Sequence, residues 1–209
     1  MAYRVKEIFY TLQGEGFRAG RPCVMLRFSG CNLWSGRQED RGASCSGWCD
    51  TDFRGGDRYT VEKLAARALS HWPAMSSAKP LVVLTGGEPS LQVDAALVQL
   101  LRAKGATVAM ETNGTLPLDG LELDWITLSP KAHTKVELEW CSELKLVFPQ
   151  LECGPEKWCN FPAGHRFLQP LWSEVTEERE QHARAASQYC LEHPEWRLSM
   201  QIHKTLGLP

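Results

Sequence analysis

The stretch Leu81-Val-Val-Leu-Thr-Gly-Gly-Glu-Pro89 runs from four apolar residues into two glycines and a proline. A short apolar run that ends at Gly and Pro is typical of a buried strand, and strands of parallel sheets are buried on both faces. Apolar residues then recur at helical spacing over 91–101, with Ser90 as a candidate N-cap and Gly105 as a C-terminal stop. This region therefore predicts a strand followed by a helix.

The same alternation of strands and helices extends in both directions. Further strands are predicted at 22–28, 106–110, 125–128, 143–148, 166–168 and 196–201, and further helices at 60–71, capped by Thr60, and 174–192. Such alternation favours a mostly parallel sheet. With about six strands the chain is short of an eight-unit barrel. The predicted fold is α/β, a partial (incomplete) TIM-like barrel of mostly parallel strands with helical crossovers, in which 30–59 and 150–164 are inserted loops.

Composition narrows the functional classes. The chain has 209 residues, of which 43% are apolar and 23% charged, which is typical of a soluble globular protein. The net charge of −2 does not suggest a nucleic-acid surface. No apolar run reaches the length of a membrane span, and the N-terminus lacks the apolar core of a secretory signal. We expect a single domain over 1–209, located in the cytoplasm.

Cysteine usage points to a metal or a cluster. The eight cysteines are Cys23, Cys31, Cys45, Cys49, Cys141, Cys153, Cys159 and Cys190. In a reducing compartment they do not form a disulfide framework, so ligation is their leading functional use. Cys23, Cys141 and Cys190 lie in apolar or helical patterns and are expected to be small buried hydrophobes.

Three cysteines lie together in a segment rich in Gly, Ser and charge, directly after the first predicted strand. Thirteen residues separate Cys31 from Cys45, and three separate Cys45 from Cys49. Three thiolates can hold three irons of a four-iron cluster and leave the fourth iron open. A structural zinc site, completed by a histidine or by Cys153 or Cys159, fits the spacing equally well. Spacing alone leaves both alternatives open.

Neighbouring motifs decide between them. They are Tyr10-Thr-Leu-Gln-Gly-Glu-Gly16, Arg27-Phe-Ser-Gly-Cys-Asn-Leu-Trp34, Cys49-Asp-Thr-Asp52, Thr85-Gly-Gly-Glu-Pro89, Glu111-Thr-Asn-Gly114 and Ser129-Pro-Lys131. In this order the chain resembles the 7-carboxy-7-deazaguanine synthases, radical S-adenosylmethionine enzymes of queuosine biosynthesis, a tRNA modification pathway. The resemblance covers nearly the whole chain. The Gly-Gly-Glu-Pro element marks only the broad radical superfamily, whereas the first and last motifs are narrower.

The resemblance implies a reaction and its cofactors. Family members convert 6-carboxy-5,6,7,8-tetrahydropterin to 7-carboxy-7-deazaguanine with loss of ammonia, as radical carbon–nitrogen lyases. A reduced 4Fe-4S cluster cleaves S-adenosyl-L-methionine, and the resulting 5′-deoxyadenosyl radical abstracts a substrate hydrogen. The resemblance also implies a modified radical core with a cluster-binding loop at about 30–59, a magnesium ion (Mg2+), a homodimer and an external electron donor, flavodoxin-like or otherwise. No nucleic-acid or membrane partner is expected.

Site residues follow from the matching motifs, and none is assigned as an acid–base catalyst. Cluster ligands are Cys31, Cys45 and Cys49, although Cys45 stands one position before the family's middle cysteine, where Ser46 is found. Cofactor contacts are Trp48, Cys49, Asp50, Gly87, Glu88, Glu111, Asn113, Ser129, Pro130, Lys131 and Gln169. Substrate contacts are Leu12, Gln13, Gly14, Arg27, Thr85 and Pro209. Thr51 is the expected Mg2+ ligand.

Physical reasons accompany several of these assignments. Gly86 and Gly87 lack Cβ, so a ligand can approach their backbone closely. Arg27 can form a bidentate contact with the substrate carboxylate, the alternative being a surface ion pair. Thr51 offers a hard oxygen to Mg2+, although Asp50 or Asp52 look better on charge alone. The resemblance also places the carboxylate of Pro209 in the substrate pocket, with His203 nearby.

Two other functions remain as alternatives. A glycyl-radical activase usually has a tight Cys-x3-Cys-x2-Cys triad, which the long gap after Cys31 disfavours. A zinc-stabilised interaction module needs a fourth protein ligand and predicts a colourless protein. Iron content and formation of 5′-deoxyadenosine under anaerobic conditions discriminate between these alternatives.

Overall fold

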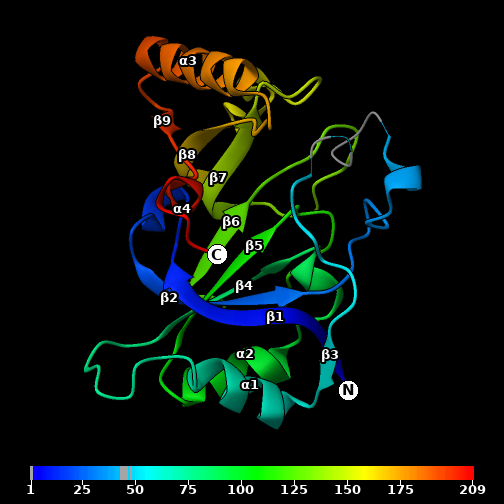
Figure 1. Ribbon diagram of the computed structural model, residues 1–209, viewed down its shortest axis with the longest axis vertical. Helices are drawn as coiled ribbons and strands as arrows, with labels where there is room; N and C mark the ends of the chain where they lie inside the picture. The colour runs from blue at the N-terminus through cyan, green and yellow to red at the C-terminus, as the bar shows by residue number, and fades with distance from the viewer. Residues whose placement is uncertain (1, 43–46, 48) are drawn as a thin grey trace.

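One curved sheet organises the chain. The structure, a computed structural model, describes residues 2–42, 47 and 49–209. In this part of the chain nine strands form a sheet in the order β3-β1-β2-β4-β5-β6-β7-β8-β9, as Figure 1 shows. Neighbours from β2 to β9 are parallel, whereas β1 pairs with β2 and β3 in antiparallel fashion. Because β3 and β9 are both edges, the barrel is incomplete, as predicted.

The predicted strands are present, several with extended ends, although the last one is shorter than the predicted 196–201. Their bounds are β2 (Pro22–Phe28), β4 (Leu81–Gly86), β5 (Thr107–Thr112), β6 (Trp125–Leu128), β7 (Cys141–Phe148), β8 (Ala163–Pro170) and β9 (Arg197–Leu198). The sequence does not predict β1 (Tyr3–Leu12) or β3 (Asp57–Tyr59). A register shift between Val5 and Glu7 interrupts the alternation of β1, which hides its strand pattern.

Three helices cover the outer face of the sheet. They are α1 (Val61–Leu69), α2 (Ala95–Ala103) and α3 (Thr176–Glu192). Figure 1 shows α1 and α2 beside the first half of the sheet and α3 beside β8. The chain from β5 to β6 and from β6 to β7 is fully described and contains no helix, so the predicted helical crossovers hold only for part of the barrel.

Helix caps agree with the sequence in one case and differ in another. The Thr60 side chain accepts a hydrogen bond from the Lys63 amide at the start of α1, as expected. Asp94, not Ser90, caps α2 by accepting from the Leu97 amide at 3.0 Å. Ser90 lies in a short 3-10 turn, and both its amide and its hydroxyl donate to Glu88. Ser90 therefore bonds to the neighbouring Glu88 carboxylate and does not cap the helix.

The hydrophobic core lies between the sheet and its helices. On β7, Leu144 and Leu146 are fully buried in this core, together with residues of α1 and α2. Because side chains alternate along a strand, Glu143, Lys145 and Val147 face the opposite side, inside the curve of the sheet. Cys23 and Cys141 are buried as expected, and Cys190 is partly buried against the core. A second, smaller apolar cluster, separate from this core, contains Cys23, Leu81, Val83 and Ala109, whereas Lys145 and Val147 line the cavity.

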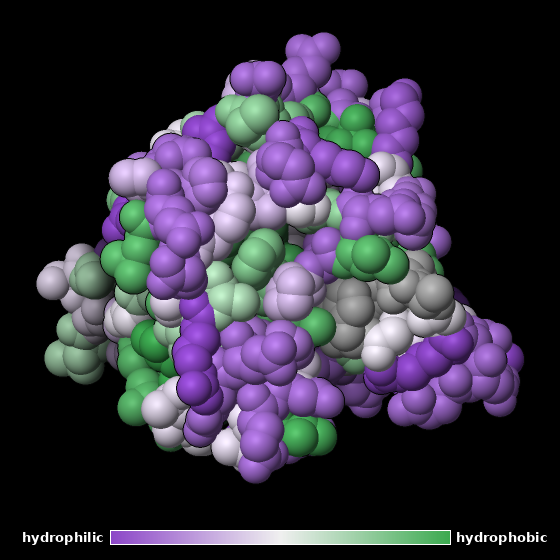
Figure 2. Space-filling model, turned by 90° about the horizontal axis from the view of Figure 1, so that it is seen from above, coloured by the Kyte–Doolittle hydropathy of each residue, from purple (hydrophilic) through white to green (hydrophobic). Residues whose placement is uncertain are grey.

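The surface in Figure 2 is mostly hydrophilic and is hollowed near its centre, where weakly polar and apolar residues show inside the hollow. The described residues contain no helix that is both long and apolar enough to cross a bilayer. A short helix that the sequence does not predict, α4 (Ile202–Leu206), precedes the C-terminus, which Figure 1 marks near the middle of the molecule. Gly207 ends α4 in the left-handed conformation, with φ +63°.

Candidate active site

A cavity of about 550 Å³ opens at the carboxyl ends of the parallel strands. Parallel barrels commonly build their sites at this end. Seventeen predicted site residues line it: Leu12, Gln13, Gly14, Arg27, Cys31, Cys49, Asp50, Thr51, Thr85, Gly87, Glu88, Glu111, Asn113, Ser129, Lys131, Gln169 and Pro209. Pro130 is buried outside this lining, and its carbonyl lies 3.8 Å from the Cys153 sulfur. Cys45 and Trp48 are outside the described residues.

Cys31 and Cys49 lie on the same wall of the cavity, in the segment that we call the cluster loop (residues 30–59). The Cys31 sulfur accepts a hydrogen bond from the Leu33 amide at 3.4 Å. Burial raises the pKa of the Cys31 thiol, and the neighbouring Cys49 thiol adds to the rise. A buried thiolate needs compensating positive charge, which an iron–sulfur cluster would supply to Cys31. The two cysteines fit such a cluster, whereas the third predicted ligand, Cys45, lies outside the described residues.

Several contacts fix the part of the cluster loop that carries Cys49. The Arg41 guanidinium donates to the Gly47 and Cys49 carbonyls at 3.2 and 3.1 Å and lies over the Trp34 ring. Asp50 pairs with Lys204 of α4, and Asp52 pairs with Lys6 of β1 at 2.8 Å. Both aspartates are thus already neutralised by lysines. Thr51, between them, lines the cavity, and its role as the Mg2+ ligand stays a prediction.

Gly86, the last residue of β4, and Gly87 both pack against protein backbone, where a side chain would not fit. An added Cβ on Gly87 would lie 1.9 Å from the Gly30 carbonyl oxygen, and one on Gly86 would lie 2.2 Å from the Phe28 oxygen. The space beside both residues is therefore filled by the backbone of β2 and of the cluster loop. Both glycines also belong to the cavity lining, so the approach of a ligand to their backbone stays a prediction. The lack of a Cβ additionally lets the turn after β4 pack directly on the start of the cluster loop.

Glu88 holds this turn against the end of β5. Its carboxylate is fully buried and accepts from the amide and hydroxyl of Ser90, from the Thr112 hydroxyl at 2.7 Å and from the Asn113 amide at 2.7 Å. Asn113 in turn donates to Asn32 of the cluster loop at 3.1 Å. Hydrogen bonds to a buried carboxylate compensate its desolvation. The strand ends and the cluster loop are thereby tied together.

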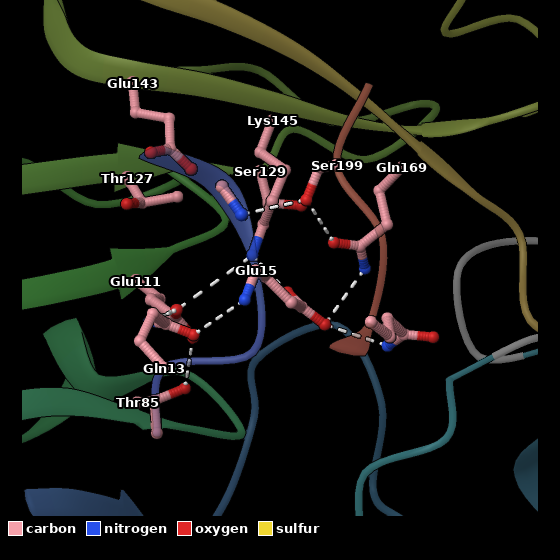
Figure 3. A network of polar contacts seen from close by, with 12 residues as sticks. Gln13, Glu15, Thr85, Glu111, Thr127, Ser129, Glu143, Lys145, Gln169 and Ser199 are labelled. Atoms are coloured by element: carbon pink, nitrogen blue, oxygen red, sulfur yellow. Dashed lines mark hydrogen bonds and ion pairs between the residues drawn. The ribbon is translucent and has the colours of Figure 1, made fainter. Parts of the chain in front are cut away.

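A second network, shown in Figure 3, forms the floor of the cavity. Glu15 forms an ion pair with Lys145 and also accepts from Gln169 at 3.1 Å and from Gln201 at 2.8 Å. Glu111 accepts from Gln13 at 3.0 Å and from Thr85 at 2.9 Å. The sequence predicts Gln13, Thr85, Gln169 and Glu111 for the site but not Glu15, Lys145 or Gln201. A lysine between Leu144 and Leu146 was the available signal for an inward-facing charge.

Charges on the floor are mutually stabilised. Burial raises the pKa of Glu15, but the Lys145 ammonium outweighs it and lowers that pKa to about 2. Burial lowers the pKa of Lys145, yet Glu15, Glu111 and Glu143 together raise it above its usual value. Burial is also the main cause of the raised pKa of Glu143. Lys145 and Glu15 are therefore both ionised at neutral pH.

The remaining predicted residues surround this floor. Arg27 lines the cavity and also pairs with Glu7 at 2.7 Å, which is an ion pair of the kind that the sequence offers as the alternative, whereas its contact with the substrate carboxylate stays a prediction. The Lys131 ammonium donates to the carbonyl and hydroxyl of Ser129, each at 2.7 Å.

At the C-terminus, the Thr11 hydroxyl donates to the Pro209 oxygen at 3.3 Å. The His203 ring occupies the space beside Gly14, where an added Cβ would lie 1.9 Å from its Nδ1. The last residues of the described chain therefore belong to the cavity wall, and His203 lies beside a predicted substrate contact.

Comparisons with known proteins give a consistent result. No protein-family model matches the chain. Proteins named 7-carboxy-7-deazaguanine synthase from Bordetella pertussis and Caulobacter vibrioides are 50% and 47% identical to it, and each alignment covers 100% of both chains. The crystal structure of QueE from Escherichia coli superposes with a TM-score of 0.70 and 26% identity, covering 96% of this chain and 94% of that one.

Proposed function

The chain belongs to the 7-carboxy-7-deazaguanine synthase family, and from this premise we propose that its cavity converts 6-carboxy-5,6,7,8-tetrahydropterin to 7-carboxy-7-deazaguanine with loss of ammonia. One observation carries the proposal. Residues predicted from six separated sequence motifs line a single cavity at the carboxyl ends of the strands. The enzyme is a radical lyase of queuosine biosynthesis that works in the cytoplasm, as a homodimer supplied by an external electron donor.

The cofactors find suitable residues in this cavity. Cys31 and Cys49, with Cys45, hold a 4Fe-4S cluster, and the turn at Gly87 with Ser129, Lys131 and Gln169 binds S-adenosylmethionine. When bound, these two groups supply the radical that removes a substrate hydrogen. The protein orients the reactants and keeps the site closed to competing reactions. The hydrogen bonds from Asn113 to Glu88 and to Asn32 serve that purpose, because they fix the cluster loop relative to the sheet.

The substrate has a carboxylate and a ring rich in N–H groups, and the cavity offers partners for both. Arg27 binds the carboxylate through its guanidinium. Thr51 holds Mg2+, which shares the carboxylate oxygens. Glu111, Gln13 and Thr85 on the floor accept from and donate to the ring edge.

Anaerobic reconstitution tests the proposal directly. The purified protein is supplied with iron, sulfide, S-adenosylmethionine, a chemical reductant and 6-carboxytetrahydropterin. We expect a brown protein that forms 7-carboxy-7-deazaguanine, identified by mass spectrometry, together with ammonia. A colourless protein that retains zinc after reconstitution would contradict the proposal and favour the zinc module. Formation of 5′-deoxyadenosine without the deazaguanine product would instead favour another radical enzyme.

Replacement of Arg27 by Met should raise the KM for the tetrahydropterin by roughly tenfold to a hundredfold, because a charge-assisted contact to a carboxylate contributes about 1.5–3 kcal/mol. Steady-state kinetics under anaerobic conditions measure the change, and R27K should recover only part of it. R184M is the matched control, since the exposed Arg184 pairs with Glu180 on α3. An unchanged KM in R27M would leave Arg27 as an ion-pair partner of Glu7 only.

Residues appended after Pro209 should impair substrate binding, because Pro209 lines the cavity and any added chain has to enter or displace it. We expect a variant extended by a short Gly-Ser segment to show a KM raised by about tenfold or more. The same segment placed at the N-terminus is the control. Normal kinetics of the extended variant would show that this end of the chain does not contact the substrate.

A further inference from the structure

Lys145 is a deeply buried charged side chain of the floor, and none of the functional roles above uses it. Its side chain is only 7% exposed, and its ammonium contacts Glu15 and lies 3.9 Å from Glu111. Groups facing it come from every side: Glu15 after β1, Glu111 from β5, Glu143 from its own strand and His203 from α4. One ammonium thus stands against three carboxylates.

Each of the two nearer carboxylates organises polar side chains that line the cavity. Glu15 fixes the amides of Gln169 and Gln201, and Glu111 fixes the amide of Gln13 and the hydroxyl of Thr85. All four side chains belong to the cavity lining. An unpaired buried carboxylate would take up a proton, and the protonated oxygen would then donate a hydrogen bond instead of accepting one. The orientation of the floor therefore depends on the charge of Lys145.

We propose that Lys145 is a positioning residue of the reaction: its ammonium is the counter-ion that keeps Glu15 and Glu111 in place as acceptors, and through them orients the floor that reads the ring edge of the substrate. This inference rests on the proposed function, since it takes the substrate to be a carboxylated pterin. One ammonium does not balance the carboxylates, so the floor keeps an excess of negative charge. That excess favours the N–H edge of the ring here and leaves the substrate carboxylate to Arg27.

The variant K145M tests the proposal on the cluster-loaded enzyme. We expect the Kd for 6-carboxypterin, a fluorescent and unreactive analogue, and the KM for 6-carboxytetrahydropterin to rise by about tenfold or more, with a much smaller change in kcat. Without the ammonium, burial raises the pKa of the Glu15 carboxyl group, so this group takes up a proton more readily. The ratio of variant to wild-type Kd should therefore fall as pH rises from about 6 to about 8, because deprotonation of Glu15 restores the acceptor.

A second variant separates positioning from folding. K145M leaves buried carboxylates unpaired and destabilises the protein, whereas K145M/E15Q removes both charges of the pair. We expect the double variant to regain thermal stability and to keep the raised Kd. K157M is the control, because the exposed Lys157 contacts only the Glu152 carbonyl. A wild-type Kd in either Lys145 variant would overturn the proposal, as would a Kd ratio independent of pH in K145M. Failure of the wild-type enzyme to bind 6-carboxypterin or to turn over would instead refute the proposed function.

Discussion

Alanine at Cys31 or at Cys49 should abolish turnover and prevent assembly of the iron–sulfur cluster. This is the largest effect that we expect from any single substitution, because a four-iron cluster held by three protein thiolates does not survive the loss of one. Both sulfurs line the cavity, and Cys31 already receives a backbone hydrogen bond of the kind that stabilises bound sulfur. Iron content, sulfide content and visible absorbance of the reconstituted protein measure the outcome without relying on activity.

Controls for this experiment come from the same chain. Cys159 is exposed, and its thiol donates a hydrogen bond to the nearby Glu156 carbonyl. C159A should therefore retain iron, colour and activity. If C31A or C49A kept a full complement of iron, the assignment of the cavity to a radical reaction would fail. If C159A lost its iron, Cys159 would be a ligand and the alternative with four protein ligands would regain support.

Cys45 makes the same experiment informative about the unusual spacing of the loop. The sequence predicts it as the third ligand, although it stands one position earlier than in the family, beside Ser46. C45A should lose the cluster as completely as C31A. C45A/S46C moves the thiol to the family position and should recover iron. Retention of iron by C45A would mean that the third sulfur comes from elsewhere in the chain.

The site was largely predictable because its residues lie at the ends of apolar runs. Thr85, Glu111 and Ser129 each follow a strand whose hydrophobic pattern is clear, and parallel strands bring their carboxyl ends together. Local sequence is thus enough to place these residues at the carboxyl ends of the strands, and in the structure all three line the cavity there. The expected reaction and cofactors follow from the resemblance of the motifs to a known family, because a hydrophobic pattern predicts strands and helices but no chemistry.

What the sequence did not predict depends on partners far along the chain. Lys145 lies in an otherwise apolar strand, and its burial is compensated by Glu15 and Glu111, which no local pattern connects to it. The tight packing of Gly86 likewise depends on its register with Phe28 in the neighbouring strand. Tertiary pairing of this kind overrides the local preference of a residue, whether for exposure or for conformational freedom.

Replacement of Gly87 by alanine should have the second-largest effect, through the backbone alone. The new Cβ would lie 1.9 Å from the Gly30 oxygen and 3.1 Å from the Cys31 amide nitrogen. Neither atom belongs to a flexible side chain, so the start of the cluster loop, with Cys31, has to move. Overpacking of this kind costs about 1–3 kcal/mol, which corresponds to a lowering of Tm by roughly 2–4 °C for each kcal/mol in a chain of this size.

The displacement of Cys31 makes the consequence specific to the cluster. We expect G87A to bind less iron than the wild type and to lose most of its activity even at temperatures where it remains folded. G154A is the matched control, since its added Cβ meets only the movable carboxylate of Glu156. Circular dichroism melting and iron content measure both variants. A G87A protein with the wild-type Tm and full iron would show that the turn after β4 can withdraw from the cluster loop, and the direct packing between them would then have no part in placing Cys31.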